Sequence, residues 1–204
     1  MTNNRPRSLL KPLCTLAFGV GVALISSQAE AHLVTTGLGP VYDGISHFAL
    51  APEDLIPVLA LALLAGLRGK EHGRRVLVVL PAAWLLGGLI GLATGAPAST
   101  SVSRIPFVLI GGLVATDIQL SVTVTMALAA LLGLFHGYLN GAAMEQARPG
   151  VLGLAGIAAN VFVVVTLTAA FVVTLRADWT RIGVRVAGSW VAAVGLLLFG
   201  WSFR

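Results

Sequence analysis

The sequence predicts an all-α protein: a polytopic membrane helix bundle with six transmembrane helices after a cleaved signal peptide. Of its 204 residues, 57% are hydrophobic and only 10% are charged. Soluble domains usually contain about 25% charged residues, so this chain has too few to cover a water-facing surface. Several apolar stretches also approach the ~18–20 residues needed to cross a bilayer. These features exclude a soluble globular enzyme, a disordered chain and a collagen-like chain.

The net charge of +5 does not indicate a nucleic-acid partner. The 13 Lys and Arg residues fall in small groups between apolar runs, whereas a groove-binding protein gathers them on one polar face. Such groups are typical of the signals that orient a membrane protein. We therefore expect the lipid bilayer as a partner and no nucleic acid.

Residues 1–31 have the composition of a secretory signal peptide. A basic start is followed by an apolar run at residues 13–25 and by small residues that fit a cleavage site. A cut after Ala31 would leave His32 as the mature N-terminus, whereas an earlier cut would leave Glu30. The alternative is an uncleaved first membrane helix.

The remaining residues, 32–204, are predicted to form a single six-helix transmembrane domain. Residues 33–52 contain too many glycines and prolines for a spanning helix. Pro52 and the two acidic residues after it then mark a helix start, because proline suits the first turn and acids suit the positive end of the helix dipole. The spans are predicted at residues 53–67, 76–94, 99–116, 120–140, 151–175 and 186–203.

Charge in the loops predicts the orientation of this domain in a bacterial inner membrane. With the mature N-terminus in the periplasm, the loops at residues 68–75, 117–119 and 176–185 lie inside. Their cationic residues are Arg68, Lys70, Arg74, Arg75, Arg176, Arg181 and Arg185, against Arg104, Arg148 and Arg204 outside. This bias agrees with the positive-inside rule.

Glycines four residues apart form strips on two of the predicted spans. The strips are Gly87, Gly91 and Gly95 in the second span, and Gly133, Gly137 and Gly141 in the fourth. Small residues at this spacing let another helix backbone approach closely. They are typical of a compact bundle, they permit a homo-oligomer, and in the fourth span they would also bring polar neighbours against another helix.

Several polar side chains are predicted near the outer membrane face, where a charge or an imidazole is costly and therefore a functional hypothesis. They are Asp43, His47, Glu53, Asp54, His136 and Asn140, joined by His32 if cleavage follows Ala31. Imidazole and carboxylate groups suit Ni, Co, Zn or Cu(II). The chain's one cysteine, Cys14, lies in the leader, so a thiolate site is not expected.

Each of these residues also has a structural interpretation. His47 fits an interfacial histidine, and Glu53 and Asp54 fit the first turn of a helix. Asp117, at the turn between the third and fourth spans, fits either an exit-side ligand or a helix terminus. A free His32 would offer its α-amine and imidazole to one Cu(II) or Ni(II) ion.

Two stretches resemble motifs of the HupE/UreJ family of small membrane proteins, and the resemblance extends over the whole chain. The family's first motif is a His followed after five residues by Asp-His; here His47 matches, Glu53 takes the acidic position, and Asp54 replaces the second His. The second motif begins Phe-His-Gly and has a Gly four residues later, as in residues 135–141. Its closing acidic position holds Ala143.

This resemblance implies a secondary permease for a divalent transition-metal ion, with nickel or cobalt favoured. The ion would be captured at the outer face by His47, Glu53, Asp54 and His136, assisted by Asp43 and Asn140. We expect no catalytic activity, no permanently bound cofactor and, without a Walker A motif, no nucleotide partner. The alternative is a non-transporting metal-binding protein, or an accessory protein in metallocentre maturation.

Overall fold

The computed structural model describes residues 36–95, 104–147 and 150–201, and the regular structure in these ranges is entirely helical. The helices are α2 (Pro40–Leu50), α3 (Pro52–Arg68), α4 (Lys70–Thr94), α5 (Ile105–Thr116), α6 (Val122–Ala147), α7 (Gly150–Thr174) and α8 (Asp178–Trp201). The all-helical prediction is confirmed. The predicted leader and His32 lie outside the described residues.

Four of the described helices, α4, α6, α7 and α8, are long and apolar enough to cross a membrane. A fifth candidate span exists if α2 and α3, which meet at a bend of 75°, are counted together. The predicted third span contains α5, an apolar helix of only 12 residues. The chain is thus a multi-pass membrane protein with four to five candidate spans in its described part, and six spans stay a prediction.

The bend between α2 and α3 has a local cause at Pro52. Proline disfavours a helical conformation in the residue before it, and Ala51 is accordingly extended, with φ −94° and ψ 92°. Pro52 then opens the first turn of α3. Residues 40–50, predicted to be too broken to span, form a separate 11-residue helix that is too short to span by itself.

The predicted inner loop at residues 68–75 is mostly helical, so this boundary was wrong. Gly69 alone separates α3 from α4, and its φ of 108° is a conformation that only glycine adopts readily. The charged first turns of α4 continue the helix beyond the apolar part of the predicted span. Hydropathy locates the membrane-embedded part of a helix, and the helix itself extends further.

Glycines bring α4 and α6 into backbone contact. The glycines at this contact are Gly87, Gly91, Gly133, Gly137 and Gly141. A Cβ atom at Gly137 would overlap the carbonyl group of Trp84, and one at Gly141 would overlap that of Gly88. Gly95 does not belong to this strip, because it ends α4 in a left-handed conformation. The predicted strips therefore pack against each other within one chain.

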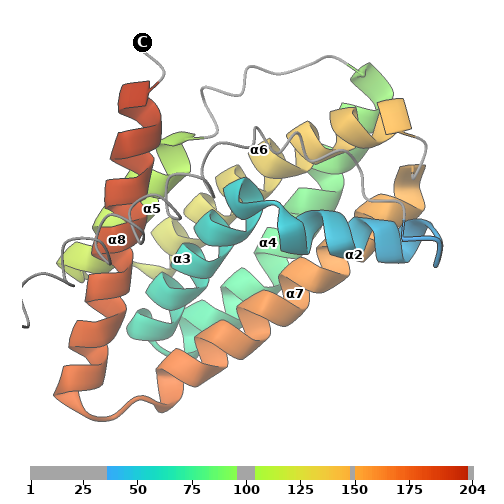
Figure 1. Ribbon diagram of the computed structural model, residues 1–204. Helices are drawn as coiled ribbons and strands as arrows, with labels where there is room; N and C mark the ends of the chain where they lie inside the picture. The colour runs from blue at the N-terminus through green and yellow to red at the C-terminus, as the bar shows by residue number, and fades with distance from the viewer. Residues whose placement is uncertain (1–35, 96–103, 148–149, 202–204) are drawn as a thin grey trace, which may run out of the picture. The chain divides into compact units, whose positions relative to one another are not determined.

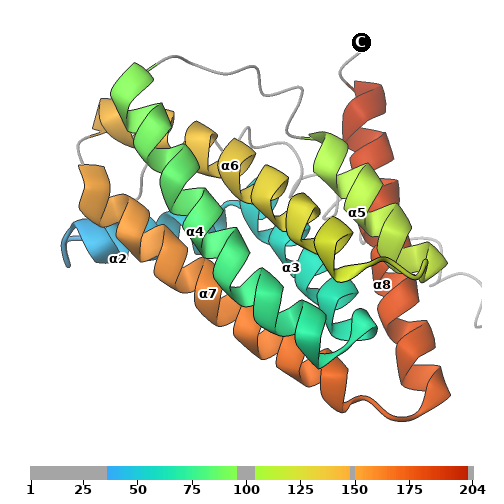
Figure 2. The ribbon, with the colours of Figure 1, turned by 180° about the vertical axis from the view of Figure 1, so that it is seen from behind.

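The same kind of glycine contact joins two other helix pairs. Gly111 and Gly188 bring α5 against α8, and Gly44 and Gly156 bring α2 against α7. Figures 1 and 2 show α3 between the α5–α8 pair and the group formed by α4, α6 and α7. Most residues in the middle of α3 are buried, so the neighbouring helices fix the position of α3 in the bundle.

Candidate metal centre

His136 lies on the face of α6 that packs against α4, and only 1% of its surface is exposed. Gly137, the next residue, permits this close approach. The imidazole ring lies beside the indole ring of Trp84, with centroids 5.7 Å apart and a tilt of 31°. Phe135, the preceding residue in α6, contacts the imidazole edge-on at 5.3 Å, so aromatic rings of α4 and α6 flank it. Phe48 of α2 contacts Trp84 edge-on at 5.6 Å and extends this aromatic cluster.

Asp54, in the first turn of α3, is the polar partner of this histidine. Its Oδ1 atom lies 2.7 Å from Nδ1 of His136, and its Oδ2 atom accepts a hydrogen bond of 2.8 Å from Nδ2 of Asn140. The same Asn140 nitrogen donates to the His136 carbonyl at 2.9 Å. An ionised carboxylate can only accept, so Nδ1 of His136 carries the hydrogen in this arrangement.

Two acceptor-type atoms of this cluster are buried without a hydrogen-bond partner, namely Nε2 of His136 and Oδ1 of Asn140. Leaving such an atom unsatisfied costs about 1–3 kcal/mol, so a native structure that retains it calls for an explanation. With Nδ1 bonded to a carboxylate, the neutral imidazole presents a lone pair at Nε2, the usual arrangement of a metal-ligating histidine. An imidazole nitrogen and an amide oxygen fit a borderline divalent cation.

The cluster unites three of the residues predicted as metal ligands, and its donor set is small. Across residues 36–95, 104–147 and 150–201, no group of three or more His, Cys, Asp or Glu is arranged to hold a metal ion. Asp54, His136 and Asn140 therefore offer a partial site, in which one imidazole nitrogen and one amide oxygen have no hydrogen-bond partner and the carboxylate holds both side chains.

Within the described residues, no hydrogen bond or ion pair joins Asp43, His47 or Glu53 to this cluster. The Glu53 side chain is exposed, although its neighbour Asp54 is buried. Asp43 accepts hydrogen bonds of 2.6 Å from both the backbone nitrogen and the hydroxyl of Thr36. His47 is buried in the last turn of α2, beside Phe48. Whether any of them binds a metal stays a prediction.

Trp84 belongs to the site but was not predicted from the sequence. It is fully buried and contacts both His136 and Phe48. A signal was available, because Trp84 stands three residues before Gly87 and therefore shares the helix face of the glycine strip. A large side chain next to glycines on one helix face indicates that it packs around a side chain of the facing helix, here His136.

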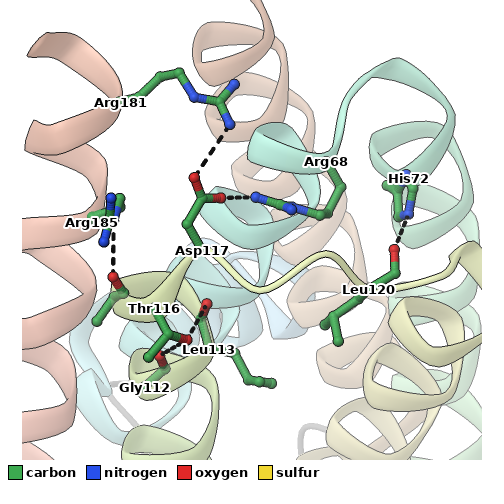
Figure 3. A network of polar contacts seen from close by, with 10 residues as sticks. Arg68, His72, Gly112, Leu113, Thr116, Asp117, Leu120, Arg181 and Arg185 are labelled. Atoms are coloured by element: carbon green, nitrogen blue, oxygen red, sulfur yellow. Dashed lines mark hydrogen bonds and ion pairs between the residues drawn. The ribbon is translucent and has the colours of Figure 1, made fainter. Parts of the chain in front are cut away.

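Asp117, predicted as either an exit-side ligand or a helix terminus, ends α5 in a left-handed conformation with φ 54°. Its carboxylate forms an ion pair with Arg68 of α3, and Nη2 of Arg181 in α8 lies 3.5 Å away (Figure 3). It is therefore a helix terminus, and two guanidinium groups share its carboxylate.

The comparison with known protein families matches residues 20–198 to the HupE / UreJ protein family. Searches of the curated proteins and of the solved structures give no significant match. The family match contains all the described helices up to the last turn of α8 and both motifs noted in the sequence. The chain therefore belongs to the HupE/UreJ family, which is associated with nickel or cobalt transport or with accessory roles.

Proposed function

We propose that this protein is a secondary permease for a divalent transition-metal ion, with nickel or cobalt favoured, in the bacterial inner membrane. One observation carries the proposal: the buried His136 ring is bonded through Nδ1 to Asp54 and has no partner at Nε2. The family membership supports it independently.

In this proposal Asp54 is a positioning residue for His136. By accepting from Nδ1, the carboxylate fixes the ring orientation and raises the basicity of the opposite nitrogen, as outer-shell carboxylates do in metal sites. Asn140 is held in turn by Asp54 and by the His136 carbonyl, which leaves its amide oxygen to face the ion. The carboxylate also supplies a negative charge close to the passing cation.

A small donor set suits an ion in transit. One imidazole nitrogen and one amide oxygen leave most of the coordination sphere to water or to transient ligands, so the ion is bound weakly enough to leave. Inward movement of a divalent cation is favoured by the membrane potential, which contributes about 2.3 kcal/mol per elementary charge per 100 mV. No chemical turnover is needed, so the protein acts as a carrier and not as an enzyme.

Binding at His136 can be tested with Trp84 as an internal reporter. The other three tryptophans, Trp179, Trp190 and Trp201, are exposed on α8 and can be changed to phenylalanine together. Ni²⁺ and Co²⁺ have open d shells and quench indole fluorescence at short range, whereas Zn²⁺ has a filled shell. We expect saturable quenching of Trp84 by Ni²⁺ or Co²⁺ and its loss in His136→Ala.

His72→Ala is the matched control, because His72 is the other histidine of α4 and α6. It is partly buried, and its Nε2 atom bonds the Leu120 carbonyl, away from this cluster. This variant should keep the quenching of the parent. Unchanged quenching in His136→Ala would contradict binding at this residue.

Transport is tested separately, by Ni²⁺, Co²⁺, Zn²⁺ and Cu²⁺ flux into proteoliposomes containing the parent or His136→Ala. Flux of at least one ion that requires His136 is the expected result. Quenching without flux would support the alternative, a metal-binding accessory protein.

A further inference from the structure

Helix α3 carries a buried charge at each end. Asp54 lies in its first turn and Arg68 is its last residue, so the two are about 21 Å apart along the helix axis. Only 1% of the Arg68 side chain is exposed. A buried charge in a membrane helix is costly unless it is paired, and each end of α3 is paired with a different part of the chain.

At the Arg68 end, the partner is the turn that follows α5. Figure 3 shows Arg68 and Arg181 reaching the Asp117 carboxylate from two directions. Arg185, one turn after Arg181 on α8, donates from Nε to the Ala115 carbonyl at 3.0 Å. Both α8 arginines therefore hold the end of α5, while Arg68 links that end to α3.

Close glycine contacts hold α5 and α8 together. Gly111 of α5 lies against the backbone of α8 at Gly188 and Ala192, and Gly195 of α8 lies against Phe107 and Val108 of α5. The main contacts of this pair with the rest of the described chain are made by α3. Separation between α3 and α5–α8 therefore breaks fewer contacts than separation within the pair.

The hydrogen-bonding groups of the Arg68–Asp117 ion pair are only partly satisfied, which does not favour a permanent structural contact. The Nε and Nη1 atoms of Arg68 are buried and make no hydrogen bond to any described group. A single carboxylate is shared between two guanidinium groups, so neither obtains a full set of partners. The cost of burying such a pair can exceed the attraction between its charges, and hydration of Arg68 would offset the loss of the contact.

We propose that the Arg68–Asp117 ion pair is a releasable latch, which holds the α5–α8 pair against α3 and keeps that end of the bundle closed to water. Release of the latch lets water reach the face of α3 that leads from Arg68 towards Asp54. That an ion leaves by this route rests on the proposed function; the latch itself does not.

Cysteine accessibility tests the latch without any transport assay. Cys14→Ser removes the chain's one cysteine. Leu64→Cys then places a thiol one turn before Arg68 on the same face of α3, at a fully buried position. In membranes, we expect slow labelling by N-ethylmaleimide in this background and labelling at least about tenfold faster when Asp117→Asn is added, a factor equivalent to ~1.4 kcal/mol.

Two further variants separate a local latch from general loosening. Asparagine tolerates the left-handed backbone at position 117, so Asp117→Asn removes the charge without straining the turn. Leu154→Cys places a thiol at a fully buried site on α7, 18 residues before Val172, the residue that contacts Gly66 near Arg68. It should stay protected in Asp117→Asn.

The labelling rates at positions 64 and 154 decide between the latch and its alternatives. Faster labelling at position 64 with protection kept at position 154 supports the latch, and Arg68→Gln should reproduce it. Unchanged labelling at position 64 overturns the proposal. Equally faster labelling at both positions also overturns it, because the ion pair would then stabilise the whole fold and not one contact within it.

Discussion

Glu53 and Asp54 are neighbours in the chain, yet their side chains have opposite surroundings. Glu53 is exposed, whereas Asp54 is 4% exposed and hydrogen-bonded to both His136 and Asn140. Successive residues on a helix point about 100° apart, so only one of two adjacent acids can face a given neighbour. The direction in which each side chain leaves the helix therefore decides whether the acid contacts His136 or lies exposed.

The two acids give a matched test of the site. Asp54→Asn removes the carboxylate that orients His136, and loss of such an outer partner typically weakens metal affinity by about 10–100-fold. Glu53→Gln should leave the affinity within about twofold, because an exposed charge contributes little. Both affinities can be measured by Ni²⁺ or Co²⁺ quenching of Trp84. An equal loss in Glu53→Gln would make Glu53 a direct ligand.

At the scale of elements, glycine contacts determine which helices can meet. The α4–α6 contact brings the Trp84 backbone against Gly137, and this spacing places the imidazole of His136 beside the indole. Within the chain, the two glycine strips cover each other. A homo-oligomer, which stays a prediction, would have to use another surface.

Gly137→Ala should therefore destabilise the protein, while Gly112→Ala should not. A methyl group at position 137 overlaps a backbone carbonyl that cannot move aside, and overpacking of this kind costs about 1–3 kcal/mol. At Gly112, in α5, a methyl group meets nothing within 4 Å, and alanine is the better helix former by about 0.5–1 kcal/mol. Thermal unfolding of both variants in detergent checks the difference. Equal transition temperatures would contradict the close contact.

At the scale of the molecule, the exposed surface of α8 is strongly apolar. Trp190 lies near the middle of this helix and is 70% exposed. A soluble protein seldom exposes so large an apolar face, whereas a membrane helix presents it to lipid. Trp84, enclosed between α2, α4 and α6, gives the opposite environment in the same chain.

Brominated phospholipids distinguish these two environments, because bromine quenches tryptophan only on contact. In nanodiscs made from such lipids, a protein with Trp190 as its sole tryptophan should lose most of its fluorescence. A protein with Trp84 alone should keep nearly all of it. Strong quenching of Trp84 would contradict the packing of α4 against α6.

Composition and hydropathy were enough to predict the helical class, the membrane environment and the positions of most helices. These properties follow from what each segment can expose to lipid, which is a local property of the sequence. The helix start at Pro52 and the two glycine strips, apart from Gly95, could be predicted because they too are local patterns in the sequence. Hydropathy could not locate the helix ends at Lys70 or Ile105, because helices extend beyond or end short of their apolar parts.

The tertiary structure decided which polar residues meet. His47, Glu53 and Asp54 were all ligand candidates in the sequence, and only packing distinguishes Asp54, which reaches His136, 82 residues further along the chain. Packing also gave Asp117, predicted as either an exit-side ligand or a helix terminus, Arg68 as its partner. A sequence shows which groups are costly to bury, but the choice of partner depends on helix rotation and on the closest approach of backbones, which are set by all the contacts of the bundle together.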